Sequence, residues 1–133
     1  MATLSAAQAE LFEEANCAVL TTLRADGSAH NTVIWVDYDG GAVSFSTLVG
    51  RAKEQHLARD PRATITIVKE PFKWISISGR VTLSSEGAEE QLDRLAQKYI
   101  DEAVYPWRAE GDVRVSVTLE IDMIDAYGIA DKE

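Results

Sequence analysis

The feature that most constrains the fold is a series of short strand-like segments joined by tight turns. Asp26-Gly27 and Asp39-Gly40-Gly41 are typical of hairpin turns, because glycine accepts the positive φ angles that such turns need. The flanking segments are rich in β-branched and aromatic residues, and several alternate between polar and apolar side chains. Strands joined by hairpins pair antiparallel, so the sequence predicts an antiparallel sheet.

The pattern predicts six strands with a few flanking helices in a single domain of residues 1–133. Helices are expected over 6–15, 53–59 and 85–99, capped in the first case by Ser5 with Gln8 and in the last by Ser85. Such a chain is mainly β (α+β), and its antiparallel sheet is expected to curl into a small barrel. The expected strands are 17–23, 30–38, 42–46, 62–68, 74–83 (with a bulge or close backbone approach at Gly79) and 113–124.

Composition excludes several classes of function. The chain has 22 acidic and 13 basic residues and a formal charge of −9, which argues against binding to nucleic acid, where affinity comes mostly from Lys and Arg. One cysteine and two histidines leave no disulfide framework and no zinc-ligand set, so we expect no metal. The start of the sequence has no signal-peptide pattern, and no apolar run is long enough to span a membrane, so we expect a cytoplasmic protein.

A strand–turn–helix stretch, SFSTLVGRAKEQHLARDP, contains the best candidate binding site. The strand ends in the hydroxyls of Ser46 and Thr47, Gly50 frees the backbone, and Arg51 and Lys53 follow at the helix start. Unpaired N–H groups and the dipole at a helix start favour an anion, and the two cations add charge. The sequence therefore indicates a phosphate site, with a solvated helix start as the alternative interpretation.

Other residues have two interpretations each. His30 could donate a proton to a substrate, or it could be a surface residue after a turn. Trp35 and Trp74 could stack on a ring system or pack in the core or an interface. The loop 105–107 (Tyr-Pro-Trp) could border a substrate pocket or only pack against its neighbours. Cys17, without a base nearby in sequence, is expected to be a buried apolar residue rather than a nucleophile.

The element order and four segments together resemble a known superfamily, the split β-barrel flavin and deazaflavin oxidoreductases related to pyridoxamine 5′-phosphate oxidase. The resemblance covers nearly the whole chain and is greatest to a small actinobacterial branch that uses coenzyme F420, a deazaflavin. It implies a homodimer with two cofactor sites at the subunit interface. The segments that carry it are 18–30, 50–65, 74–83 and YPW at 105–107 before RVSVTLEI at 114–121.

The resemblance also implies which residues bind the cofactor. Arg51 and Lys53 match positions that hold the cofactor phosphate, and Trp74 matches a position supplied by the second subunit. The strand 28–38 and the loop 44–53 would together form one wall, with residues 32–35 along the ring edge. The implied cofactor-binding set is Thr32, Val33, Ile34, Trp35, Phe45, Ser46, Thr47, Gly50, Arg51, Lys53 and Trp74.

The implied activity is hydride transfer from F420H2 to an electron-poor conjugated small molecule of the enone, quinone or tetrapyrrole type. The alternatives are an FMN-dependent oxidase or reductase and a non-catalytic module that binds a cofactor or haem. No catalytic residue is assigned, and His30 is the one candidate proton donor. Thr32 stands where pyridoxamine phosphate oxidases carry an arginine, which argues against vitamin B6 activity. Cations that could serve the polyglutamate tail of F420 are Arg24, Lys69, Lys73 and Arg80.

Overall fold

In the computed structural model, which describes residues 2–130, seven strands form one antiparallel sheet in the order β2-β1-β5-β6-β7-β4-β3. Three helices accompany the sheet in this part of the chain. No helix within it is long and apolar enough to cross a membrane. The elements in chain order are α1 Ala6–Glu13, β1 Ala18–Leu23, β2 Ala29–Ile34, β3 Asp37–Asp39, β4 Ala42–Leu48, α2 Ala52–Arg59, β5 Arg62–Glu70, β6 Lys73–Ser84, α3 Ala88–Ile100 and β7 Arg114–Tyr127.

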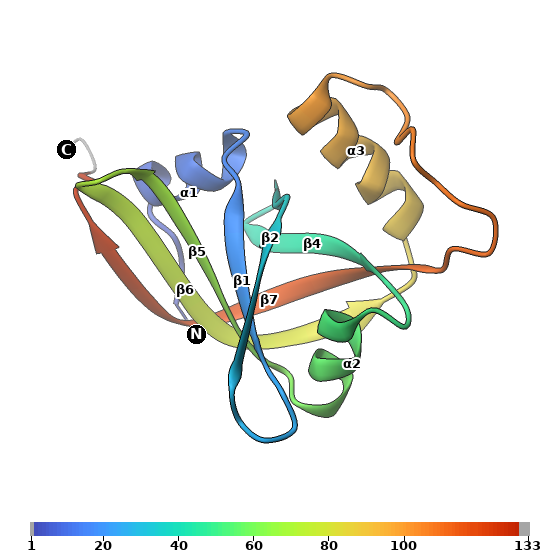
Figure 1. Cartoon of the computed structure of the whole chain (residues 1–133). Helices are drawn as coiled ribbons and strands as arrows, with labels where there is room; N and C mark the ends of the chain where they lie inside the picture. Colours follow the sequence, from blue (N-terminus) through green and yellow to red (C-terminus); the bar gives the residue numbers. More distant parts are fainter. Residues whose placement is uncertain (1, 131–133) are drawn as a thin grey trace.

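The sheet curls around an apolar core, and the helices lie at its ends and edges (Figure 1). Alternate residues of the strands point inward, as a side-chain period of two requires. Burying these side chains removes apolar surface from water and is the main driving force for folding. The predicted mainly β, curled antiparallel architecture is confirmed. Fully buried core residues include Phe12, Leu20, Phe45, Ile65, Ile67, Ile75, Ile77 and Val117.

The expected strand 30–38 is in fact two strands, so the sheet has seven strands where six were predicted. β2 pairs with β1 at one edge of the sheet, and β3 pairs with β4 at the other. The chain therefore leaves the sheet at Trp35 and Val36 to cross between the edges. Partners for the Val36 backbone come from α3: its N–H donates to Tyr99 Oη at 3.0 Å, and its carbonyl accepts from Lys98 Nζ at 2.7 Å.

The ends of the elements show one confirmed cap and two corrections. Ser5 and Gln8 form the predicted capping box of α1. Ser85 does not cap α3, because the helix begins later, after Gly87, whose φ of 70° places it in the left-handed region that glycine tolerates. Cys17 is exposed rather than buried, since it precedes β1 and the inward-facing residue is Ala18.

Gly79 marks the predicted irregularity in β6. The register of the β6–β7 ladder shifts between Ser78 and Gly79. A Cβ atom at Gly79 would overlap the carbonyl oxygen of Glu120 on β7, a backbone atom that cannot rotate away. The close approach of the two backbones therefore requires glycine at this position.

We predict that Gly79→Ala destabilises the protein by about 1–3 kcal/mol, because the added methyl group must push two paired strands apart. Chemical denaturation measures the change. Ser78→Ala is the matched control, since it removes only the hydrogen bond to Thr64, worth about 1 kcal/mol or less. Equal stability of Gly79→Ala and the wild type would contradict the close approach.

Candidate functional site

A groove lies where α3 covers the paired residues at the end of β4 and the beginning of β7. The end of β2 and the beginning of α2 border it. Its volume is about 190 Å³. Six residues predicted from the sequence line it together: Val33, Ile34, Trp35, Ser46, Arg51 and Lys53. The remaining lining residues are Leu92, Leu95, Tyr105 and Arg114.

The groove is cationic in an acidic protein. Arg51, Lys53 and Arg114 line it, and no carboxylate of residues 2–130 does, although the chain carries a formal charge of −9. Lys53 is half-buried and forms no hydrogen bond or ion pair with any residue in the described range 2–130. Burial, and then the charge of Arg51, lower the pKa of the Lys53 amine below its usual value of 10.5. A partly desolvated, unpaired ammonium group is suited to an anionic ligand.

The backbone at the start of α2 adds to this potential. Arg51 is the N-cap residue, and its side chain makes no capping hydrogen bond. The first N–H groups of a helix have no intrahelical acceptor, and the helix dipole is positive there. Gly50 turns the chain with a φ of 97°, and its N–H donates to Glu54 Oε1 at 2.8 Å. This carboxylate is the only acidic residue of the first turn and does not line the groove.

Two buried donors that line the groove have no hydrogen-bond partner in the described residues: the Ser46 hydroxyl and Nε of Arg114. The Thr32 and Thr47 hydroxyls are also buried without a partner in this range, but neither lines the groove, and Thr47 is on the opposite face of β4 from Ser46. Buried polar atoms normally find a partner, so unsatisfied donors beside unpaired cations mark a place for a ligand with many acceptors. A phosphate on a polyol chain, as in FMN or F420, fits this donor set. No group of three or more His, Cys, Asp or Glu residues between positions 2 and 130 is placed to hold a metal ion.

Aromatic residues form the opposite wall. The Trp35 ring stacks on Tyr99 with 5.2 Å between centroids and 4° between planes, and the Tyr105 ring meets Trp35 edge-on at 6.3 Å. Tyr99 Oη accepts from the Val36 N–H and donates to the Asn16 carbonyl at 2.6 Å. Burial raises the pKa of Tyr99, so the phenol stays protonated and keeps both bonds. α3 thereby fixes the orientation of Trp35 at the groove.

Several predicted site residues lie outside the groove lining. Phe45 is fully buried in the core, Gly50 lies in the turn before α2, and neither Thr32 nor Thr47 lines the groove. Thr47 lies on the same face of β4 as Phe45, opposite Ser46. His30 instead packs edge-on against His56 of α2, with 4.9 Å between ring centroids, and its Nδ1 atom has no partner within residues 2–130.

Trp74 and the four extra cations are also elsewhere. Trp74 pairs across strands with Tyr127, on the face of the sheet away from the core. Lys69 forms an ion pair with Glu14, and Arg24 donates to the Ala29 carbonyl. The two others, Lys73 and Arg80, do not line this groove either.

The sequence did not identify Arg114, Leu92 or Leu95 as site residues. Arg114 begins β7 and lies opposite Leu48 of β4, two residues from the Ser46–Ser116 pair on the same face. In sequence this face reads as the polar, solvated side of an alternating strand. α3 covers it with its apolar side chains, so only the strand register and the position of α3 reveal the groove.

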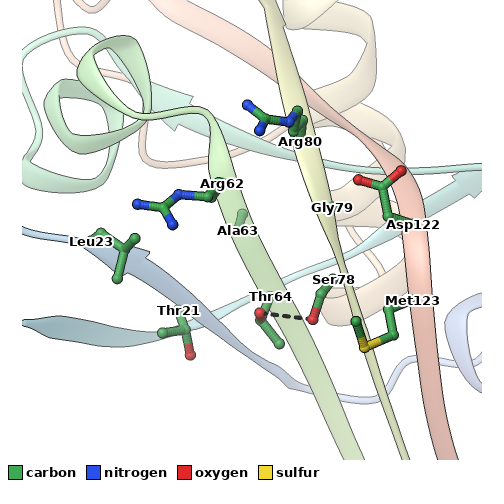
Figure 2. Close-up of a pocket in the computed structure, with 10 residues that line it drawn as sticks. All are labelled: Thr21, Leu23, Arg62, Ala63, Thr64, Ser78, Gly79, Arg80, Asp122 and Met123. Carbon is green, nitrogen blue, oxygen red and sulfur yellow. Dashed lines mark hydrogen bonds between the residues drawn. The ribbon is translucent and has the colours of Figure 1, made fainter. Parts of the chain in front are cut away.

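A second hollow, of about 320 Å³, lies on the outer face of β1, β5, β6 and β7. Figure 2 shows Arg62 and Arg80 near one end and the Thr64–Ser78 hydroxyl pair, 3.0 Å apart, further along. Arg62 forms a bidentate ion pair with Asp60, which offsets its charge. This face carries hydroxyl and exposed apolar side chains, among them Val19, Val68 and Met123, beside the charged Arg62, Arg80 and Asp122.

The fold agrees with comparisons to known proteins. A family model for pyridoxamine 5′-phosphate oxidase matches residues 4–127. The chain belongs to this family. Its superfamily contains flavin and deazaflavin oxidoreductases. No curated protein matches the sequence.

Solved structures confirm the split-barrel fold. An F420 reductase is 19% identical, with a TM-score of 0.78, 87% of this chain covered and 94% of that one. A conserved hypothetical protein from Mycobacterium tuberculosis is 20% identical, with a TM-score of 0.73, and the match covers 98% of this chain and 91% of that one. General stress protein 26 from Bacillus anthracis is 14% identical, with a TM-score of 0.68 and 92% of each chain covered. At these identities the likeness shows the fold and leaves the substrate open.

We predict that Tyr99→Phe lowers the free energy of unfolding by about 1–3 kcal/mol, because it leaves the Val36 N–H and the Asn16 carbonyl without a partner. Denaturant titration measures the loss. Tyr38→Phe is the control, since Tyr38 is half-buried and its hydroxyl bonds to no residue in the described part of the chain. Similar losses for the two variants would show that the Tyr99 hydroxyl does not hold the crossing.

Proposed function

We propose that the groove binds coenzyme F420 and that the protein uses F420H2 to reduce an electron-poor conjugated small molecule. The observation that carries this proposal is the half-buried Lys53, unpaired within the described part of the chain, in a groove that this part lines with three cations and no carboxylate. The F420 reductase among the structural neighbours supports the choice of deazaflavin over FMN.

Residues of this chain would bind and orient the cofactor. Arg51 and Lys53 would hold the phosphate, with the N–H groups of the first turn of α2 behind them. The Ser46 hydroxyl would donate to the polyol chain, and Trp35, fixed by Tyr99, would set the plane of the ring system. When bound in its reduced form, the deazaflavin supplies the hydride. Because His30 does not line the groove, the proton that follows would come from solvent.

We also propose a homodimer in which the outer face of the sheet packs against a second copy. Val33 lines the groove yet is 66% exposed, so one wall of the groove is open to solvent. Trp74 lies on the outer face with exposed Val68 and Tyr127 beside it, where it could reach the groove of a partner. The cytoplasmic location stays a prediction from the sequence.

Titration of the purified chain with oxidised F420 and, separately, with FMN tests the proposal. Quenching of tryptophan fluorescence reports binding, because Trp35 lines the groove. Tight binding of F420 and weak binding of FMN would support the proposal, and reduction of an enone or quinone panel with F420H2 would then follow. The reverse preference would indicate an FMN enzyme, and F420 binding without turnover would indicate a carrier. Light scattering of the same sample tests the dimer.

We predict that Lys53→Met weakens cofactor binding by about 1.5–3 kcal/mol, or roughly 10- to 150-fold, the range for a hydrogen bond to a charged group. The same fluorescence titration measures the change. Lys69→Met is the matched control, because Lys69 pairs with Glu14 away from the groove and its loss should leave affinity unchanged. Equal affinities of wild type and Lys53→Met would remove Lys53 from the site.

The lowered pKa of Lys53 predicts a pH dependence. An anion binds the ammonium form, so affinity is highest below the pKa of free Lys53 and falls as pH rises through it, by at most tenfold per pH unit for one group. Because this pKa is below 10.5, the fall begins at lower pH than for an exposed lysine. Lys53→Arg should abolish this fall of affinity with rising pH, since arginine stays charged. A pH-independent affinity in the wild type would contradict this role for Lys53.

A further inference from the structure

Arg114 is a third cation in the groove. Its Nε atom is buried and has no hydrogen-bond partner within residues 2–130. Its side chain forms no ion pair with a residue in that range, while its guanidinium carbon lies 5.2 Å from the centroid of the Tyr105 ring. The guanidinium is thus held by an aromatic face and keeps its charge unneutralised, an arrangement that leaves its N–H donors for a ligand.

The neighbouring Arg108 shows the contrast. It also lies over the Tyr105 ring, at 6.0 Å, but it pairs with Glu89 at 2.8 Å and with Asp93 at 2.9 Å. Asp93 in addition accepts from the Tyr105 N–H at 2.9 Å. Arg108 therefore has a structural role in holding the loop, and the pairing that neutralises it is missing at Arg114.

The position of Tyr105 is fixed on several sides. Its backbone is bound to Asp93, and its ring contacts Trp35 and Trp107 edge-on, the latter with 5.6 Å between centroids. Arg114 packs against this ring at the aromatic wall, whereas Arg51 and Lys53 come from the start of α2. The groove thus presents two cationic positions on different elements.

We propose that Arg114, supported by Tyr105, binds a carboxylate of the molecule that reacts in the groove. Guanidinium groups bind carboxylates through two parallel N–H···O bonds, and no carboxylate among the described residues lines the groove to compete. The inference rests on the proposed function for the ligand at Arg51 and Lys53. A carboxylate supplied by the substrate would narrow the substrate class to conjugated carboxylic acids. The carboxylate could belong to the substrate or to the glutamate tail of the cofactor.

Benzoate is the probe, with benzamide as its uncharged match. NMR of the Arg Nε–H signals of the full chain follows binding with and without a saturating cofactor. We expect benzoate to shift the Arg114 signal and to bind about tenfold or more tightly than benzamide. Arg114→Gln should lower the affinity for benzoate about tenfold or more, and Arg114→Lys should lower it less. Arg80→Gln, on the outer face of the sheet, should leave the affinity unchanged.

Two results would overturn the proposal. One is benzoate binding with equal affinity to wild type and Arg114→Gln, provided that circular dichroism shows both folded. The other is an equal loss of FMN affinity in Arg114→Gln and Lys53→Met, which would place Arg114 in the phosphate site. Tyr105→Leu provides an independent check, because loss of the aromatic ring under Arg114 should also lower the affinity for benzoate. Tyr105→Phe keeps the ring and should leave the affinity unchanged.

The source of the carboxylate follows from the cofactor arms, because FMN carries no carboxylate. If Arg114→Gln weakens the binding of F420 but not that of FMN, and F420 displaces benzoate, the carboxylate is that of the cofactor tail. If benzoate binds together with saturating F420, it is that of the substrate. Either result supports a carboxylate site at Arg114. Failure of wild type to bind F420 or FMN, with benzoate binding intact, would overturn the proposed function and leave this inference standing.

Discussion

The backbone of Val36 imposes the constraint on which the rest of the structure depends. A chain that leaves one edge of the sheet and joins the other must bury peptide groups that have no strand partner, and each unmet group costs about 1–3 kcal/mol. Val36 is fully buried, and the side chains of Tyr99 and Lys98 bind its N–H and carbonyl. Lys98 also donates to the Phe12 carbonyl at 2.5 Å, which ties α1 to the same point. This crossing between the two edges of the sheet determines the split of the barrel, the position of α3 and the orientation of Trp35.

Local chemistry in the sequence was enough to predict most of the fold. Asp-Gly turns, alternation along the strands and the Ser5–Gln8 capping pair all act within a few residues, so they can be recognised without knowing what lies nearby in space. The segment 30–38 was predicted as one strand because every residue in it favours extended backbone. Strand propensity carries no information about pairing, and the two halves of this segment pair at opposite edges of the sheet. Tertiary pairing therefore decided what local preference could not.

The same distinction separates the predicted part of the site from the missed part. Ser46, Arg51 and Lys53 belong to one continuous strand–turn–helix stretch, and their meeting in one groove follows from that short connection. Arg114 is more than sixty residues further along the chain, and it joins them through the register that pairs it with Leu48. Its neighbours on the polar side of β7 look solvated in the sequence. The covering by α3 turns that surface into a half-buried wall, where an unpaired charge has a much larger effect than in water.

The hydroxyl groups on the outer face of the sheet have a consequence for association. Thr64 bonds Ser78 and Thr66 bonds Ser76, each at 3.0 Å, so each pair keeps one hydrogen bond across neighbouring strands without water. When a second surface covers such a pair, one O–H donor needs a new acceptor instead of two, which lowers the cost of removing water. The same face also carries the charged side chains of Arg62, Arg80 and Asp122, so a surface that covers it must provide partners for them as well.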